Sequence, residues 1–247
     1  MRSASKTGLR KSGRRAAPRA HTEIEVKLRI PDKRRLLGQL ARLKAKFIGP
    51  RVHEMNTLYE TPDGSLSRRG QMLRLRVERP ASRAKGVGRA RKADPGKLGT
   101  SALLTFKGPA KGRKASRPGL YKIREESEVS LSDPGEALII LKALGVRPWF
   151  RYEKFRTLFE LPRMRGLTVA LDETPIGVFL ELEGPREEIN RAAELLGFAR
   201  SGYINKSYGA LFIEERGLAG RASHNEPVPF SGVPDMVFGR SYAPKAP

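Results

Sequence analysis

Three pairs of glutamates, each pair separated by one residue, are the residues of this chain best placed to do chemistry. They are Glu23/Glu25, Glu126/Glu128 and Glu181/Glu183, and each pair lies in a stretch with the alternation of a β-strand. Side chains two positions apart on a strand point to the same face, about 7 Å apart, so each pair brings two carboxylates into one space. Such carboxylates repel each other without a cation. Because the chain has 49 Lys and Arg against 26 Asp and Glu, this pairing of its scarce acids suggests a divalent metal site.

Basic residues alternate along the same predicted strand faces. The acid pairs and Asp172 can supply oxygen ligands to Mg²⁺ or Mn²⁺, hard cations that favour carboxylates, water and phosphate. The basic side chains would bind phosphate oxygens; they are Lys27, Arg74, Arg76, Lys107, Arg124, Lys154 and Arg156. Metal ions and cationic side chains around one cavity are what phosphoryl transfer requires. For any single glutamate, a cross-strand ion pair with Lys or Arg is the alternative interpretation.

The strands that carry these residues are predicted from period-two alternation. They are expected at Thr22–Ile30, Met55–Glu60, Gln71–Glu78, Ala102–Lys107, Leu120–Leu131, Phe150–Leu161, Leu167–Asp172 and Gly177–Gly184. Helices are expected at Pro31–Lys46, Asp133–Leu144, Arg186–Leu196 and Ile204–Glu215. About eight strands without long strand–helix alternation favour an antiparallel sheet or barrel with helices outside. The pattern alone leaves open whether the charged faces line a closed barrel or face water.

Positive charge is concentrated in two segments of a chain whose net charge is +23. Residues 1–20 carry seven Lys or Arg and no acid, and residues 79–122 carry thirteen basic residues and one acid, Asp94. We expect a basic disordered tail over 1–20, a folded domain over 21–217 with a mobile basic insertion at about 80–99, and a flexible tail over 218–247. The basic segments fit nonspecific contact with a polyanion, and a solvated charge run is the alternative.

The composition excludes several classes of protein. The chain has no cysteine, which excludes a disulfide framework and a thiolate metal site. No stretch approaches about 18 apolar residues, so we expect no contact with a membrane interior and a cytoplasmic protein as the default. A G-x-x-x-x-G-K-[ST] loop is also missing from the sequence, so P-loop chemistry is unsupported.

The order of these motifs along the chain resembles the CYTH family of triphosphate tunnel metalloenzymes, which groups class IV adenylyl cyclases, thiamine triphosphatases and inorganic triphosphatases. The series runs Glu23-x-Glu25-x-Lys27, Arg74-x-Arg76, Lys107-Gly108, Arg124-x-Glu126-x-Glu128, Lys154-x-Arg156, Asp172 and Glu181-x-Glu183. The resemblance covers about His21 to Leu211. It implies an α+β fold in which eight antiparallel strands close into a barrel, the triphosphate tunnel, with helices packed outside.

The resemblance also implies a role for each matching residue. The metal-coordinating acids would be Glu23, Glu25, Asp172, Glu181 and Glu183, and the central pair Glu126/Glu128 would either bind metal or orient an arginine. The phosphate-binding cations would be Lys27, Arg74, Arg76, Lys107, Arg124, Lys154 and Arg156. Lys107 is the expected catalytic residue, which would position or deprotonate the attacking water. Lys206-Ser207-Tyr208 is interpreted as a packing and capping feature that lies near the tunnel in this family.

Three functions remain open at this point. Hydrolysis of an inorganic or organic triphosphate is the leading prediction, because the segment from Asn56 to Asp63 is similar in spacing to the triphosphatase branch. Leu58 lies where thiamine triphosphatases have a tyrosine, which argues against thiamine triphosphate. The alternative is a class IV adenylyl cyclase that makes cyclic AMP and pyrophosphate from ATP. A further alternative is a non-catalytic module that binds polyphosphate or nucleic acid through the basic segments.

Overall fold

The computed structural model describes residues 21–81, 100–110, 119–216 and 235–238. The strands of this part are β1 (His21–Arg29), β2 (Lys46–Phe47), β3 (Val52–Glu60), β4 (Met72–Pro80), β5 (Ser101–Lys107), β6 (Lys122–Ser130), β7 (Arg147–Glu160), β8 (Thr168–Thr174) and β9 (Gly177–Glu183). The helices are α1 (Lys33–Arg42), α2 (Ser65–Arg68), α3 (Pro134–Ala143), α4 (Arg186–Leu195) and α5 (Tyr208–Glu215), with a 3-10 helix, η2, at Arg200–Gly202. The predicted tail over 1–20, most of the predicted insertion and most of the C-terminal tail lie outside the described residues.

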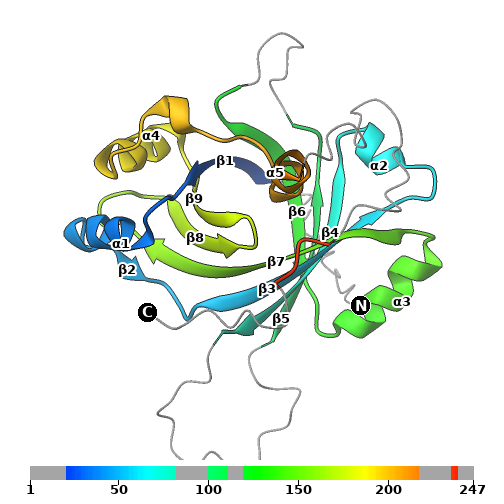
Figure 1. Ribbon diagram of the computed structural model, residues 1–247. Coiled ribbons are helices and arrows are strands. Elements are labelled where there is room, and N and C mark those ends of the chain that lie inside the picture. Colours follow the sequence, from blue (N-terminus) through cyan, green and yellow to red (C-terminus); the bar gives the residue numbers. More distant parts are fainter. Residues whose placement is uncertain (1–20, 82–99, 111–118, 217–234, 239–247) are drawn as a thin grey trace, which may run out of the picture.

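Eight of the strands form a closed antiparallel barrel (Figure 1). Their order is β7-β3-β4-β5-β6-β1-β9-β8, and β8 pairs back with β7 to close the ring. Closure depends on the length of β7, which pairs with β3 along Arg147–Arg156 and with β8 along Phe155–Phe159. The short β2 adds a ninth strand at the far end of β7. The expected α+β barrel with outer helices is therefore confirmed.

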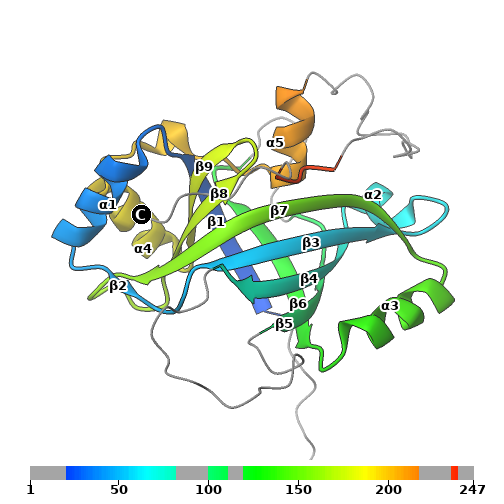
Figure 2. The same ribbon diagram turned by 60° about the horizontal axis from the view of Figure 1, so that its bottom comes forward.

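Helices cover the apolar outer faces of the strands on two sides. Helices α1 and α4 lie together beside β1, β8 and β9, and α3 lies at the opposite side (Figure 2). Leu36 and Leu40 of α1 and Ile189 of α4 are buried against these strands. Leu141 of α3 packs against Tyr59 and Leu75, which are outward residues of β3 and β4. Since these apolar faces are buried outside the ring, the charged faces of the same strands must point into it.

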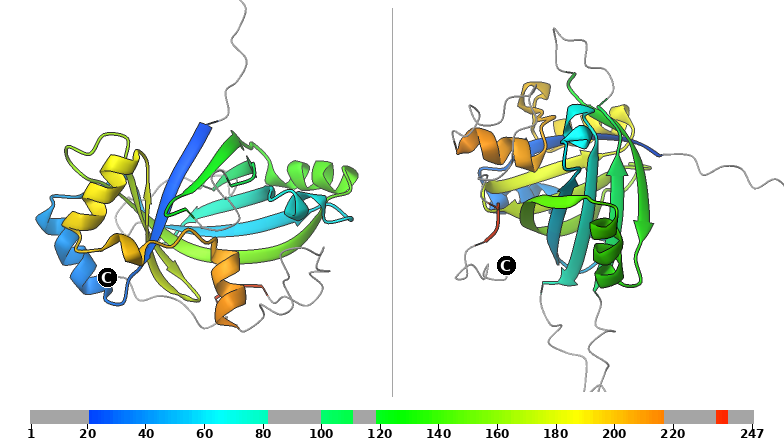
Figure 3. Two further views of the ribbon diagram at one scale, coloured as in Figure 1. Left: turned by 90° about the horizontal axis from the view of Figure 1, so that it is seen from above. Right: turned by 90° about the vertical axis from the view of Figure 1, so that its right-hand side faces the viewer.

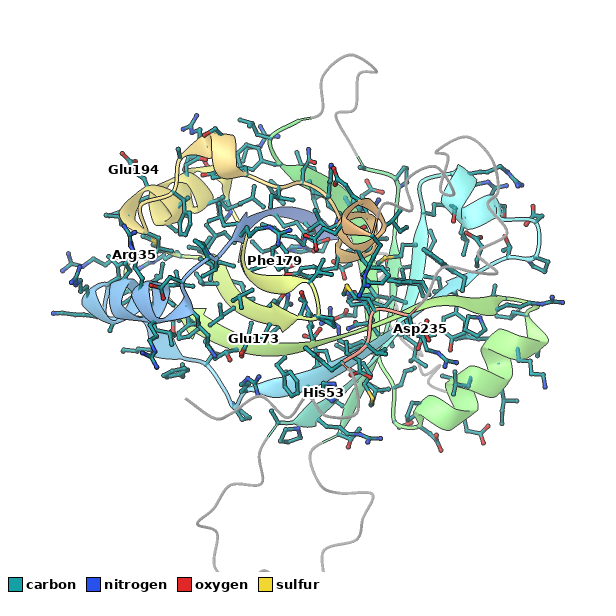
Figure 4. The ribbon with its side chains drawn as sticks, viewed as in Figure 1. Arg35, His53, Glu173, Phe179, Glu194 and Asp235 are labelled. Carbon is teal, nitrogen blue, oxygen red and sulfur yellow. The ribbon has the colours of Figure 1, made fainter. Side chains whose placement is uncertain are left out.

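Helix α5 and the segment 235–238 lie together on a third side, between the two groups of helices (Figure 3). Met236 bridges the edge of β7: its N–H donates to the carbonyl of Arg151 (2.8 Å) and its carbonyl accepts from Glu153 N–H (2.9 Å). The Met236 side chain is buried among the aromatic rings of Phe150 and Phe212. Figure 4 labels Phe179, which belongs to the same buried cluster, and Asp235, which begins the segment. No described helix is long and apolar enough to cross a membrane.

Several predicted boundaries were wrong for local reasons. The first predicted helix extended to Lys46, but α1 ends at Arg42 because Lys44 adopts a left-handed conformation (φ 56°). The predicted helix at Ile204 begins only at Tyr208, since Ile204 forms a backbone bridge with Lys27 and Ser207 is the N-cap. Strand β3 begins at Val52, three residues before the predicted start. The two short elements α2 and β2 were not predicted.

Candidate active site

The inward faces of the strands surround a cavity of about 670 Å³ whose lining is mostly charged. This cavity brings together twelve of the fourteen predicted site residues: Glu23, Glu25, Lys27, Arg74, Arg76, Lys107, Glu126, Glu128, Lys154, Arg156, Glu181 and Glu183. They come from six strands of the ring, β1, β4, β5, β6, β7 and β9. The alternation of each strand therefore aims its charged residues at one common space.

The other two predicted residues, Asp172 and Arg124, do not line the cavity. Asp172 is fully buried and accepts hydrogen bonds from Lys154 Nζ (2.9 Å), from Arg156 Nε and Nη2 (2.7 and 2.6 Å) and from Tyr208 Oη (2.8 Å). In this arrangement Asp172 orients two cations of the cavity wall. Its role as a metal ligand stays a prediction. Arg124 lies opposite Glu23 in the pairing of β6 with β1.

Lysines neutralise most carboxylates at one part of the cavity. Lys107 Nζ lies 2.8 and 2.6 Å from the two oxygens of Glu23 and 3.0 Å from Glu126. Glu25 accepts hydrogen bonds from Lys27 (2.9 Å) and Lys122 (2.6 Å). Burial would raise the pKa of Glu25, but the two lysines outweigh it and hold that pKa well below its ordinary value. Among the described residues, no group of three or more His, Asp or Glu side chains is arranged to hold a metal ion.

Glu183 is the carboxylate that lacks such a partner. Within the described part of the chain it has no ion pair, and it lies directly opposite Glu25 in the pairing of β9 with β1. Burial, with further repulsion from Glu23 and Glu25, raises the pKa of Glu183 to about 7. A half-buried carboxylate beside two others, with no ion pair of its own in the described part of the chain, leaves this part of the cavity short of one positive charge. The oxygens of Glu23, Glu25 and Glu183 are of the type that a divalent cation binds, although the three side chains are not gathered in the geometry of a metal site in the described part of the chain.

Four cations line another part of the cavity. They are Arg74, Arg76, Lys154 and Arg156, all from β4 and β7. Carboxylates form ion pairs with two of these cations. The Arg156 guanidinium donates hydrogen bonds to Asp172 and Glu181. Arg74 Nη2 lies 4.0 Å from Glu126 Oε1 and 3.7 Å from Glu128 Oε2. A cavity that gathers cations from the two strands on either side of β3 can bind the oxygens of a phosphate chain.

Four further residues at this site were not among the predicted site residues: Glu54, Lys122, Tyr152 and Tyr208. Lys122 could have been predicted from the sequence, because it shares the inward alternation with Arg124 and Glu126. Glu54 was not predicted as a site residue because its strand was predicted to start at Met55. Tyr152 could also have been predicted, because it lies two residues before Lys154 and therefore shares the inward face of β7. Tyr208 belonged to a motif interpreted as packing and capping; Ser207 does cap α5, and the Tyr208 hydroxyl binds Asp172.

Comparison with known proteins places this geometry in context. A sequence model of the CYTH domain matches residues 21–204. A candidate adenylate cyclase of Methanocaldococcus jannaschii is 26% identical over 207 residues, which cover 79% of this chain and 99% of the relative.

Solved structures are similar in fold. A candidate adenylate cyclase from Vibrio parahaemolyticus matches with a TM-score of 0.60 at 18% identity, covering 78% of this chain and 98% of that one. The PH1819 protein of Pyrococcus horikoshii matches with a TM-score of 0.57 at 23% identity, covering 78% and 99%. At these identities the likeness shows a shared fold.

Proposed function

Because the chain belongs to the CYTH domain family, whose members are adenylyl cyclases and triphosphatases, we propose that it hydrolyses a triphosphate bound in the barrel cavity with the help of Mg²⁺ or Mn²⁺. One observation carries this proposal. A single cavity contains the cations Arg74, Arg76, Lys154 and Arg156 and also a carboxylate cluster in which Glu183 has no ion pair among the described residues. Phosphoryl transfer needs both parts next to each other.

The lining of the cavity favours inorganic triphosphate as the substrate. Charged side chains dominate it, and among the described residues Met72 is the one non-aromatic apolar residue of the lining. Sites that recognise a nucleobase are lined mainly by apolar and aromatic side chains. The two tyrosines of the lining, Tyr152 and Tyr208, belong to the aromatic cluster of the barrel wall, and Lys154 lies over the Tyr208 ring. A chain of phosphates satisfies this lining better than a nucleoside does.

Glu23, Glu25 and Glu183 would hold the metal ion, which when bound supplies a concentrated positive charge to the phosphate oxygens. Arg74, Arg76, Lys154 and Arg156 bind the remaining phosphate oxygens and fix the direction of the chain. Lys107 shares its ammonium group between Glu23 and Glu126. From that position Lys107 orients the water that attacks the terminal phosphorus and assists its loss of a proton.

Cyclisation of ATP is the second candidate, favoured by the name of the Methanocaldococcus jannaschii relative. In that reaction the 3′-hydroxyl of ATP attacks the α-phosphorus and pyrophosphate leaves. The same cations would bind the phosphates, and only the attacking group and the phosphorus attacked would differ.

Phosphorus NMR of the purified full chain separates the two reactions. The protein is incubated with inorganic triphosphate or with ATP, in Mg²⁺ and then in Mn²⁺. Orthophosphate from inorganic triphosphate supports the proposed hydrolase, whereas cyclic AMP with pyrophosphate from ATP supports the cyclase. Turnover of neither substrate contradicts both reactions.

A double variant, Glu25→Gln with Glu183→Gln, tests the role of the carboxylates. It should abolish turnover because two of the three metal-binding carboxylates are lost. The matched control is Glu153→Gln, which removes a carboxylate that pairs with His53 away from the cavity lining and should leave turnover intact. Retained turnover in the double variant would refute metal-assisted catalysis at this site.

A further inference from the structure

Glu54 of β3 is a buried carboxylate with an unusual set of neighbours. It is fully buried and lies just behind the cavity lining. Lys154 Nζ lies 3.3 Å from Glu54 Oε2, Arg76 Nε lies 3.5 Å from Oε2, and Arg156 Nε lies 3.5 Å from Oε1. One carboxylate is thus shared by three cations, and all three cations line the cavity.

The contacts of Glu54 differ in kind from those of Asp172. Asp172 is fixed by directed hydrogen bonds from Lys154, Arg156 and Tyr208. Within the described residues neither oxygen of Glu54 has a hydrogen-bond partner, although both are buried. Its attraction to the cations is therefore electrostatic and sets little constraint on their direction. The cations can turn toward a ligand in the cavity without breaking a hydrogen bond to Glu54.

Glu54 stays ionised in these surroundings. Burial alone would raise its pKa, but Arg76, Lys154 and Arg156 outweigh burial and hold the pKa well below the ordinary value for glutamate. The cavity wall thus contains a permanent negative charge next to the cations proposed to bind phosphate.

We propose that Glu54 is a positioning residue that acts as an internal counter-anion: it keeps Arg76, Lys154 and Arg156 close together when the cavity is empty by balancing part of their charge, without fixing their direction, and weakens the binding of phosphate chains when the cavity is filled. The inference rests on the proposed binding of a phosphate chain in this cavity. A negative charge behind the phosphate-binding cations lowers the positive potential that a phosphate chain meets there. This weakening helps products leave, because binding energy common to substrate and product lowers KM without raising kcat.

The test is the affinity of the full chain for inorganic triphosphate in a chelator, measured by isothermal titration calorimetry. The absence of metal and turnover separates binding from catalysis. Glu54→Gln should bind inorganic triphosphate about tenfold more tightly than the unmodified chain, because a buried negative charge close to the ligand has been removed. Glu54→Asp keeps the charge and should bind with nearly unchanged affinity.

Glu173→Gln is the matched control. Glu173, labelled in Figure 4, is also a buried glutamate with two cations, Lys33 at 3.0 Å and Arg51 at 2.9 Å, but these cations do not line the cavity. The same loss of charge there should leave the affinity unchanged. Equal tightening in Glu173→Gln would mean that net charge alone is responsible and would overturn the role of Glu54.

Two further readouts distinguish positioning from a purely structural role. Without anions Glu54→Gln should melt at a lower temperature than the unmodified chain, and inorganic triphosphate should raise its Tm more. In turnover Glu54→Gln should show a lower KM together with a lower kcat and stronger inhibition by phosphate products.

Unchanged or weaker binding by folded Glu54→Gln, while the unmodified chain binds, would overturn this inference alone. If the unmodified chain does not bind triphosphate, the proposed function fails as well. Should Glu54→Gln be unfolded without ligand, triphosphate must restore its folding, and failure to do so would also refute the inference.

Discussion

At the scale of single residues, the cavity is an almost balanced set of opposite charges. Lys107 neutralises Glu23, and Lys27 and Lys122 neutralise Glu25. Removing one partner of such a buried pair leaves an uncompensated charge, which is strongly destabilising. Glu183 has no ion pair among the described residues, and its raised pKa is the physical sign of that imbalance.

The raised pKa of Glu183 predicts how folding stability depends on pH in a chelator. In the folded chain Glu183 keeps its proton up to a pH of about 7, whereas an ordinary glutamate releases it near 4.5. Between these values the folded chain binds a proton that the unfolded chain has lost, so this contribution to stability falls as the pH rises. We expect the difference in Tm between Glu183→Gln and the unmodified chain to grow from pH 4.5 to pH 7 in favour of the variant.

If Glu183 binds a metal ion as proposed, Mn²⁺ should reverse that difference at pH 7.5, because the unmodified chain keeps the carboxylate proposed to bind the ion. Thermal unfolding followed by circular dichroism measures both effects. A pH-independent difference in the chelator would show that Glu183 titrates as an ordinary glutamate.

Lys107 should matter for the rate of reaction more than for substrate binding. Lys107→Met should lower kcat about 100-fold, the typical loss when a positioned proton-transfer group is removed, while KM changes less. The control is Lys142→Met on the exposed face of α3, where the same change should leave kcat intact. Steady-state rates with inorganic triphosphate measure both variants. An equally small effect of the two changes would exclude Lys107 from catalysis.

At the scale of elements, the free edge of β7 explains why α5 and the segment 235–238 dock where they do. Strand β7 pairs with β8 only from Phe155 onward, so the earlier part of that edge needs another partner. Met236 supplies one backbone bridge there, and α5 places Tyr208 and Phe212 against the same aromatic cluster. Two elements distant in sequence thus complete one wall of the barrel.

Met236 should therefore contribute substantially to stability. Met236→Ala should lower the free energy of unfolding by about 2–5 kcal/mol, because it leaves a cavity among packed rings. Val237→Ala is the neighbouring control: Val237 is 43% exposed, so its truncation should have a small effect. Denaturant unfolding of both variants measures the difference. Equal and small losses would show that the segment is not firmly packed on the barrel.

At the scale of the whole molecule, positive charge is distributed unevenly between the barrel and the segments attached to it. Residues 82–99 connect β4 to β5, which are adjacent antiparallel strands with Glu78 opposite Ser101. Because the two strand ends are already neighbours, a short turn can join them. The barrel and its cavity therefore do not depend on the length of this connection.

Replacing residues 82–99 with a short Gly-Ser turn should leave the fold and the cavity intact. We expect Tm to change by no more than about 5 °C, and the affinity for inorganic triphosphate in a chelator to be retained at high salt. At low salt the affinity should fall somewhat, since the replaced residues are basic and unscreened charges attract an anion at a distance. Loss of a cooperative unfolding transition would show that the connection is part of the folded domain.

The sequence by itself predicted most of the barrel and of the candidate site. Alternation with period two identified eight strands and the face of each strand that carries Glu, Lys and Arg. The prediction succeeded for these residues because the alternation of a strand is a local property of the backbone. It failed at Lys44 and Ile204, where backbone conformation and long-range pairing end the helical pattern, and at Glu54, where the strand start was placed too late.

Only the tertiary structure decided what surrounds the charged faces and which charges meet. Alternation shows that a strand has two faces but does not show which one is enclosed; the pairing of β7 with β8 and the packing of α1, α3 and α4 decide that. The pairing of β1 with β9 then sets Glu25 opposite Glu183, residues far apart in the chain. Such partnerships depend on strand order and register, which follow from the burial of the whole molecule rather than from any local stretch of sequence.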